Sequence, residues 1–198
     1  RKLLRAWARA RIKGLENLNT FINFLWEKKK IAIIAVLAIL SFILFWNFLR
    51  TIIIMLAFIA LGLASMYYYK FIRFPFGFEL NMLGIVITGK LFGAMPAIIV
   101  GMTALFFAEL ITERMTHSTI ISFLGVIAVG FLIPVFPPDW SITKLGIIAT
   151  LVYDAIIIPL YLLLGSSPAR SGIFLATHIV FNVWVFTFVA PNVYRIFI

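Results

Sequence analysis

Three polar side chains lie inside apolar stretches in the last third of the chain. His178 and Asn182 are one helical turn apart in one apolar run, and Asp154 follows Tyr153 in the run before it. Placing an ionisable group in hydrocarbon costs at least about 2.5–3.5 kcal/mol, so such residues usually mark a functional site or an internal polar contact. Measured along their predicted helices, they lie at similar depths. We therefore expect Asp154, His178 and Asn182 to meet between adjacent helices, with Tyr153 beside them.

Two kinds of chemistry fit these residues. Donors and acceptors that converge near the middle of a membrane can bind a small polar solute or an ion. They can equally form a closed hydrogen-bond network that only joins two helices. The sequence leaves both interpretations open. For the first, we predict that the ligand-binding residues are Tyr153, Asp154, His178 and Asn182.

The spacing His178-x-x-x-Asn182 also resembles a fragment of the CAAX-processing type of intramembrane metalloprotease. Metal-dependent hydrolysis needs about three ligands and a general base such as glutamate. Glu109 and Glu113 match the double-glutamate motif of that family poorly, and His117 lies at a predicted membrane boundary. The chain has no cysteine, which excludes disulfides and zinc–sulfur sites. We predict no catalytic residue, no metal site and no cofactor, and keep a metalloprotease as the second alternative function.

The composition is that of an integral membrane protein. Of the 198 residues, 64% are hydrophobic and only 12% are charged, and the mean hydropathy is +1.12. A soluble domain carries about twice that charged fraction. We predict an all-α, polytopic helical bundle of six to seven transmembrane helices in residues 31–198, behind a basic amphipathic helix in residues 1–30. The apolar runs cover approximately 31–49, 51–70, 75–92, 93–112, 117–136, 143–164 and 171–190.

The boundary between the first two runs carries no helix breaker. Residues 46–51 contain neither glycine nor proline. One helix over residues 31–72 would be about 60 Å long, twice the thickness of the hydrocarbon layer. A tight hairpin, with Asn47 and Arg50 at the membrane interface, is therefore the favoured prediction, and the sequence leaves a single helix over residues 31–72 open as the alternative.

The first 30 residues are strongly basic, with nine of the 17 Lys and Arg residues of the chain. Apolar residues recur between them every three or four positions, which suits a helix on the anionic cytoplasmic leaflet. A solvated helix, or one that packs on another subunit, is the alternative. The aromatic and glycine patterns of RNA-binding modules are missing, so we expect no nucleic acid partner. The predicted membrane-surface residues are Arg5, Arg9, Arg11, Lys13, Lys28, Lys29 and Lys30.

The distribution of positive charge predicts the orientation. If the chain crosses the cell membrane seven times from a cytoplasmic N-terminus, most Lys and Arg residues fall on the cytoplasmic side. That is the side on which short loops of membrane proteins collect positive charge. We therefore predict a cytoplasmic N-terminus.

Small residues recur at intervals of four. Gly89, Gly93 and Gly101 lie on one such ladder, and Ala60 and Ala64 form a second pair. Small residues at this spacing let helix backbones approach closely, either within one chain or between subunits. We predict these five residues as a surface that docks a membrane protein partner.

The segment 74–111 resembles the substrate-binding membrane components of energy-coupling-factor transporters, and equally the related rod-shape-determining membrane subunits. In both families a segment broken by proline and glycine, here Pro75 and Gly77, leads to an apolar helix, a glycine-spaced turn, a glycine-rich helix and an acidic residue, here Glu109. The resemblance implies six helices and a vitamin-like or other small polar solute bound between the later ones. It also implies that Ala60 and Ala64 dock the transmembrane coupling subunit.

These observations favour a non-enzymatic function, although they do not decide whether the chain is an enzyme. We predict an integral membrane solute-binding component of a transporter, without an ATPase of its own, that binds a small polar solute between its late helices. The alternative is a non-catalytic structural or assembly subunit of a larger membrane complex, which the basic N-terminal helix and the small-residue ladders favour.

Overall fold

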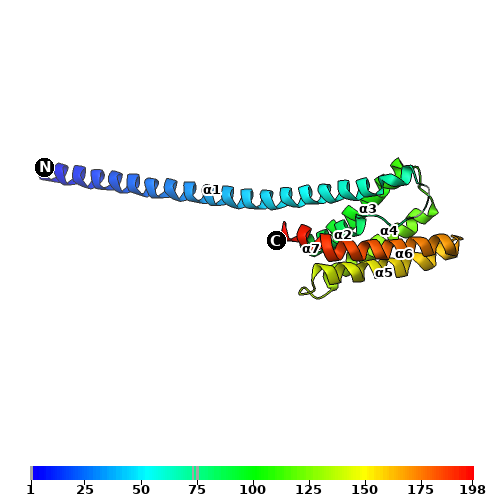
Figure 1. Cartoon of the computed structure of the whole chain (residues 1–198). Helices are drawn as coiled ribbons and strands as arrows, with labels where there is room; N and C mark the ends of the chain where they lie inside the picture. The colour runs from blue at the N-terminus through cyan, green and yellow to red at the C-terminus, as the bar shows by residue number, and fades with distance from the viewer. Residues whose placement is uncertain (1, 73, 75) are drawn as a thin grey trace. The chain divides into compact units, whose positions relative to one another are not determined.

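The computed structural model describes the backbone of residues 2–72, 74 and 76–198, and the side chains of residues 26–72, 74 and 76–198. All secondary structure in this part of the chain is helical (Figure 1), so the prediction of an all-α fold is confirmed. The elements are α1 (Lys2–Met66), η1 (Tyr67–Lys70), α2 (Asn81–Phe92), α3 (Ala94–Ile111), α4 (His117–Leu132), η2 (Ile133–Val135), α5 (Ile142–Leu163), α6 (Pro168–Trp184), η3 (Val185–Val189) and α7 (Ala190–Arg195).

The chain divides into two units, residues 1–50 and residues 51–198, which we call the N-terminal unit and the C-terminal bundle. In the N-terminal unit, Lys28, Lys29 and Lys30 are exposed, and Lys30 pairs with Glu27 at 2.9 Å. The amphipathic character of residues 1–30 stays a prediction, because the side chains of residues 1–25 lie outside the described part. The predicted membrane-surface residues among them are Arg5, Arg9, Arg11 and Lys13.

The predicted hairpin near Asn47 and Arg50 is wrong, because α1 is helical without interruption from Lys2 to Met66. The prediction rested on matching helix length to bilayer thickness. The local sequence favours the helix instead, since residues 46–51 contain no residue that breaks one. The orientation argument counted seven crossings with that turn, and the prediction of six to seven transmembrane helices is unconfirmed.

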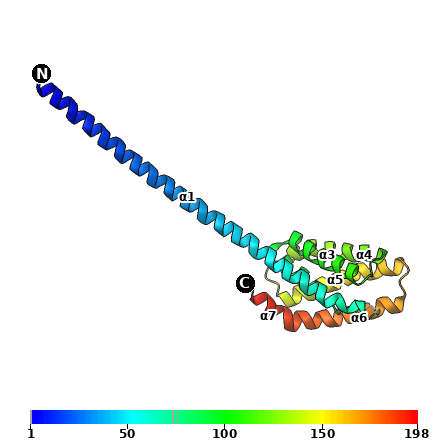
Figure 2. The same ribbon diagram turned by 90° about the horizontal axis from the view of Figure 1, so that it is seen from above.

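The C-terminal bundle is built from consecutive helices that pack against one another. Contacts join α2 to α3, α3 to α4, α4 to α5 and α5 to α6, and Figure 2 shows α3, α4, α5 and α6 grouped together. The last turns of α1 also belong to this bundle, where Ile54, Phe58 and Met66 are buried in the core. Burial of apolar side chains between the helices and hydrogen bonding within each helix account for this architecture.

The run predicted as a helix over residues 75–92 forms a helix only from Asn81. At 12 residues, α2 is about 18 Å long, which is short of the hydrocarbon thickness. The described residues of the segment before it, including Gly77, are not helical. A single residue, Gly93, then separates α2 from α3, with a φ of 92° that favours glycine. The correction matters for function, because the non-helical segment contributes to the candidate site.

Five helical stretches of the described residues are long and apolar enough to cross a membrane. Large apolar side chains are exposed along them, such as Leu124 on α4 and Phe188 in η3. A contiguous apolar exterior of this kind is typical of a protein in contact with lipid. The stretches are Trp26–Lys70, Ala94–Ile111, His117–Val135, Ile142–Leu163 and Pro168–Arg195.

Candidate functional site

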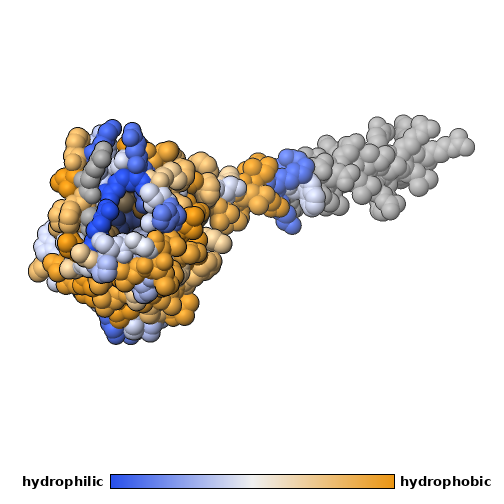
Figure 3. Space-filling model, turned by 90° about the vertical axis from the view of Figure 1, so that its right-hand side faces the viewer, coloured by the Kyte–Doolittle hydropathy of each residue, from blue (hydrophilic) through white to orange (hydrophobic). Residues whose placement is uncertain are grey.

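A cavity of about 560 Å³ opens at one end of the C-terminal bundle. Figure 3 shows this end, where hydrophilic residues surround a hollow and hydrophobic residues cover the flanks. The cavity is bounded by the end of α1, the loop between α3 and α4, and the loop between α5 and α6. Its volume falls in the range of small-molecule sites.

Hydroxyl groups line much of the cavity wall. The Ser122 and Tyr161 hydroxyls lie 2.6 Å apart, and those of Ser166 and Ser171 lie 3.0 Å apart. Each such pair joins two segments of the wall, since Ser122 is on α4 and Tyr161 on α5. Hydroxyls both donate and accept, so the wall can meet either kind of polar group on a solute.

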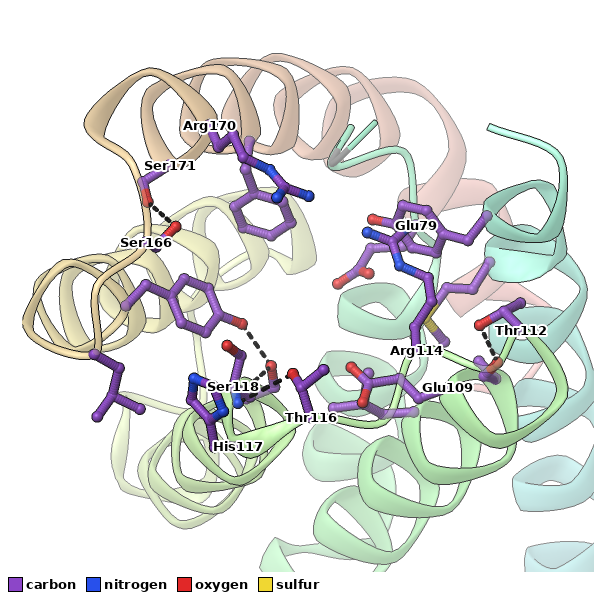
Figure 4. A pocket seen from close by; sticks show the side chains of 18 of the residues that line it. Glu79, Glu109, Thr112, Arg114, Thr116, His117, Ser118, Ser166, Arg170 and Ser171 are labelled. Atoms are coloured by element: carbon purple, nitrogen blue, oxygen red, sulfur yellow. Dashed lines mark hydrogen bonds between the residues drawn. The ribbon is translucent and has the colours of Figure 1, made fainter. Parts of the chain in front are cut away.

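The charged residues of the cavity lining differ in how deeply they are buried. At its mouth, Arg170 and His117 are exposed, while Arg114 and Glu109 are half-buried. Glu79 is the most buried charged residue of the lining. Figure 4 shows Arg170, from α6, and Arg114, from the opposite wall, both directed into the cavity. We call the region of Arg170, His117 and Arg114 the mouth, and the region of Glu79 the inner end.

Glu79 belongs to a buried group of three ionisable side chains, whose other members, His178 and Asp154, are not part of the cavity lining. The His178 ring on α6 has Asp154 of α5 on one nitrogen, with 2.8 Å between Nδ1 and Oδ1. Glu79 lies on its other nitrogen, with 3.7 Å between Nε2 and Oε1. The ring stacks on Phe174, with 5.1 Å between ring centres. The predicted meeting of Asp154 and His178 is confirmed.

The two carboxylates flank the imidazole from opposite ring nitrogens, which restricts where protons can lie. If Nδ1–H donates to Asp154, a neutral His178 has a lone pair on Nε2 facing Glu79. A lone pair facing an ionised carboxylate is repulsive, so a proton on either His178 Nε2 or the Glu79 carboxyl is favoured. The described residues contain no group of three His, Cys, Asp or Glu side chains able to hold a metal ion.

The non-helical segment before α2 is held in place by hydroxyl groups. The Tyr68 and Tyr69 hydroxyls both donate to the Phe76 carbonyl, and the Gly77 amide donates to Thr177 Oγ1 at 2.9 Å. Irregular backbone is tolerated at membrane depth only where such partners replace the helical hydrogen bonds. Gly77 packs so closely on His178 that a Cβ there would overlap its backbone. This packing brings the following Glu79 to His178.

The sequence analysis did not identify Glu79 as a site residue. It precedes α2 but lines the cavity and faces His178. Burial raises the pKa of the Glu79 carboxyl; His178 opposes this rise and Asp154 adds to it. The signal that was present is the break at Pro75 and Gly77, which places non-helical backbone and an acid inside an apolar run.

The four residues predicted as ligand-binding occupy different places. Tyr153 lines the cavity, whereas the other three do not belong to its lining. Asp154 and His178 lie behind Glu79. Asn182 is fully buried, and its amide nitrogen donates to the His178 carbonyl one turn earlier in the same helix, at 3.0 Å. Direct contact of these residues with a ligand stays a prediction.

The predicted docking surface needs correction at two positions. Gly89 and Gly101 are buried, where a Cβ would meet Ile133 and Ile85, so these glycines serve packing inside the bundle. Gly93 forms the turn between α2 and α3. Ala60 and Ala64, by contrast, are exposed on α1. Only that pair and Gly93 remain available to a partner.

Comparison of the chain with known protein families, with curated proteins and with solved structures gives no match. The cavity and the residues around it are therefore the basis on which a function is assigned.

Proposed function

We propose that the chain is an integral membrane protein that binds a small polar solute in the cavity of its C-terminal bundle, and that it is the solute-binding component of a transporter. The observation that carries the proposal is a cavity of about 560 Å³, with hydroxyl and charged groups in its wall, at one end of a bundle whose outer surface is apolar. A lipid-facing exterior and a hydrophilic interior are the two requirements for holding a polar solute within a membrane.

The inner end of the cavity supports a role in transport. Ionisable residues inside membrane-spanning bundles are costly to bury and occur mainly on solute or proton pathways. Glu79, His178 and Asp154 form such a group at the inner end of the cavity, which Glu79 lines. The sequence has no phosphate-binding glycine loop, so the energy for transport comes from a partner with an ATPase or from an ion gradient.

The proposed location is the cell membrane, with the N-terminus in the cytoplasm. The apolar helical stretches are compatible with a membrane location. Positive charge supports the orientation, because nine Lys and Arg residues precede residue 31 and a cytoplasmic N-terminus keeps them on the inner side. Lys28, Lys29 and Lys30 lie at the start of an apolar stretch, where long basic side chains reach the lipid headgroups.

Native mass spectrometry of the protein, extracted gently from its own membrane, tests the proposal. We expect the mass of the chain, 22.4 kDa, with an added small molecule. Ser122→Leu extends an apolar side chain into the cavity and removes the hydroxyl contact with Tyr161, so this variant loses the added mass. Ala155→Leu makes a similar increase in size on the exposed face of α5 and keeps it. A protein without any adduct, or equal adducts on both variants, contradicts the proposal.

A second candidate function is an assembly subunit, favoured by the exposed surface of α1. Its side chains from Trp26 to Phe48 are all exposed, and the stretch Trp26–Lys70 contains no buried residue in its most apolar window. A helix that is apolar all round is normally covered by lipid or by other helices. Ala60 and Ala64 add a small-residue pair further along the same helix.

Co-purification distinguishes this candidate from the first. Ala64→Trp places a bulky ring on the exposed small-residue pair and should release a bound membrane subunit, whereas Ala155→Trp on α5 should not. Partner subunits that remain with both variants argue against docking through this pair.

A further inference from the structure

We infer that the cavity binds a small zwitterion, with an anionic oxygen group held by Arg114 and Arg170 and a protonated amine held by Glu79. The inference rests on the proposed function, because it names the chemistry of the solute that the same cavity takes. Its basis is the difference in burial between the exposed or half-buried basic residues of the mouth and the buried Glu79 carboxyl of the inner end.

Arg114 has a donor that no group in the described part of the chain satisfies. Its Nη1 atom is buried and lacks a hydrogen-bond partner there. The guanidinium lies over the Tyr69 ring, 4.2 Å from its centre, which fixes the plane of the group and leaves its N–H edge available. An unsatisfied buried donor is unfavourable, so an acceptor that enters the cavity is stabilised at this position. Guanidinium groups bind carboxylate and phosphate oxygens through paired hydrogen bonds.

Arg170 adds a second positive charge on the other wall. It lies in the first turn of α6, which contains no acidic residue. The helix dipole is positive at that end, so a cation there is unfavourable unless an anion is close. The N-terminus of α4, at His117, reaches the same space. Among the described residues, neither Arg114 nor Arg170 forms an ion pair, and the Glu109 carboxylate of the mouth accepts a hydrogen bond from Thr119 instead.

The inner end has the opposite character. The Glu79 carboxylate is buried, and its ion-pair partner in the described part of the chain is the His178 ring, which lies 3.7 Å from its oxygen and carries a charge only when it is protonated. That ring already pairs with Asp154, so one imidazole serves two carboxylates. A buried carboxylate requires a positive partner, and an ammonium group in the cavity supplies it. A zwitterion therefore satisfies both ends, whereas a simple anion or cation satisfies one.

Two-point recognition is tested with three soluble probes on the full chain in phosphatidylcholine nanodiscs. Phosphoethanolamine carries a phosphate and an amine, inorganic phosphate carries only the anion, and ethanolamine carries only the amine. Binding is measured by isothermal titration calorimetry and by the shift of the unfolding temperature. We expect phosphoethanolamine to bind at least tenfold more tightly than either single-group probe. β-Alanine, with a carboxylate in place of the phosphate, tells which anionic group the arginines prefer.

Charge-removing variants assign each end of the probe. R114Q and R170Q should each weaken phosphoethanolamine at least tenfold and leave ethanolamine unchanged. E79Q should weaken phosphoethanolamine and leave inorganic phosphate unchanged. Lys144→Gln is the matched control, because it removes a positive charge that stacks on Trp140 away from the cavity lining, and it should change none of these affinities.

The lipid composition of the nanodisc distinguishes a soluble zwitterion from a zwitterionic lipid headgroup. If phosphatidylethanolamine nanodiscs stabilise the wild-type protein but not R170Q, and soluble phosphoethanolamine has no effect, the zwitterion is a lipid headgroup. The inference is overturned if the solute found by mass spectrometry is uncharged, or if its retention is the same in R114Q, R170Q and E79Q as in the wild type. That result leaves the proposed function intact. If Ser122→Leu loses the solute while the three charge variants retain it, the proposed function holds and the inference of a zwitterion fails.

Discussion

The contact between Asp154 and His178 joins α5 to α6 through two groups that are almost completely buried. Breaking a buried pair by removing one partner is costly, typically about 3–5 kcal/mol, because the other charge stays buried without compensation. Replacing both partners by apolar groups of similar shape removes that penalty. The pair therefore contributes more to the arrangement of the helices than to net stability.

A double-variant cycle follows from this contact. His178→Phe and Asp154→Leu should each lower the free energy of unfolding by about 3–5 kcal/mol. The double variant should lose less than the sum of the two, with a coupling of about 1–3 kcal/mol, because neither charge is left alone. Asp154→Asn, which keeps a hydrogen-bond acceptor for Nδ1, serves as the control and should cost less than Asp154→Leu. Additive losses, measured by denaturant unfolding in detergent, would show that the two side chains are not coupled.

The stability of the bundle should depend on pH through the Glu79 carboxyl, and the direction of its pKa shift gives the sign of this dependence. Burial raises its pKa above the usual 4.5, so the native protein keeps this proton to a higher pH than the unfolded chain does. The stability contributed by the protonated carboxyl is complete below about pH 4.5, and it is lost as the pH rises towards the native pKa. The unfolding temperature of the wild type, relative to Glu79→Gln, should therefore fall between about pH 4.5 and the native pKa. A difference that does not change with pH contradicts this assignment.

At the scale of elements, the described residues of the segment 71–80 determine the position of Glu79, and therefore the location of the candidate site. Its contact with α6 depends on Gly77, because a Cβ at this position would overlap the His178 backbone. Gly77→Ala should therefore destabilise the protein by about 1–3 kcal/mol, as other substitutions that overfill a packed site do. It should also weaken solute binding, since Glu79 moves with the segment. Thermal unfolding and the retained adduct measure the two effects.

The matched control for this glycine is Gly172, on the exposed side of α6. No atom lies within 4 Å of a Cβ built there. Alanine has a higher helix propensity than glycine, by up to about 1 kcal/mol. Gly172→Ala should therefore leave stability unchanged or increase it slightly. Equal losses in the two variants would mean that the close packing on His178 is not what limits position 77.

The sequence predicts some of these elements well and others poorly, for physical reasons. Long apolar runs predict α3, α4, α5 and α6, because helix formation inside a membrane is nearly obligatory. The predicted hairpin near Asn47 is wrong because bilayer thickness does not determine the local backbone conformation. Residues 46–51 lack a helix breaker, so the helix continues through them. The start of α2 at Asn81 is missed because tyrosine hydroxyls and Thr177, distant in sequence, satisfy the unwound backbone.

The residues of the candidate site were likewise predicted only in part from the sequence. Asp154 and His178 stand out because ionisable residues in apolar runs are rare, and their contact could be predicted from depth along two neighbouring helices. Arg114 and Arg170 could not be assigned to a cavity, because basic residues in loops between helices are ordinary in sequence. Their role depends on three loops that meet at one end of the bundle, which only the packing of all the helices defines.

At the scale of the whole molecule, the two ends of the C-terminal bundle should lie on opposite faces of the membrane. The loop between α3 and α4 is at the cavity end, and the loop between α4 and α5 is one helix length away. The latter loop is held by Lys90, whose Nζ donates to the carbonyls of Pro138 and Trp140 at 3.0 and 2.9 Å. Basic and aromatic side chains of this kind commonly lie at a membrane interface.

Cysteine labelling tests this arrangement directly, because the chain has no cysteine of its own. Met115→Cys and Asp139→Cys place one thiol in each of the two loops, at exposed positions, and Ala155→Cys places one on the outer face of α5. In sealed vesicles of one orientation, a membrane-impermeant maleimide should label either Met115→Cys or Asp139→Cys from outside. The other should react only after the vesicles are opened, and Ala155→Cys should react in neither case, because lipid covers it. Labelling of both loops from the same side would show that the bundle does not span the bilayer, and the apolar exterior would then require a protein partner to cover it.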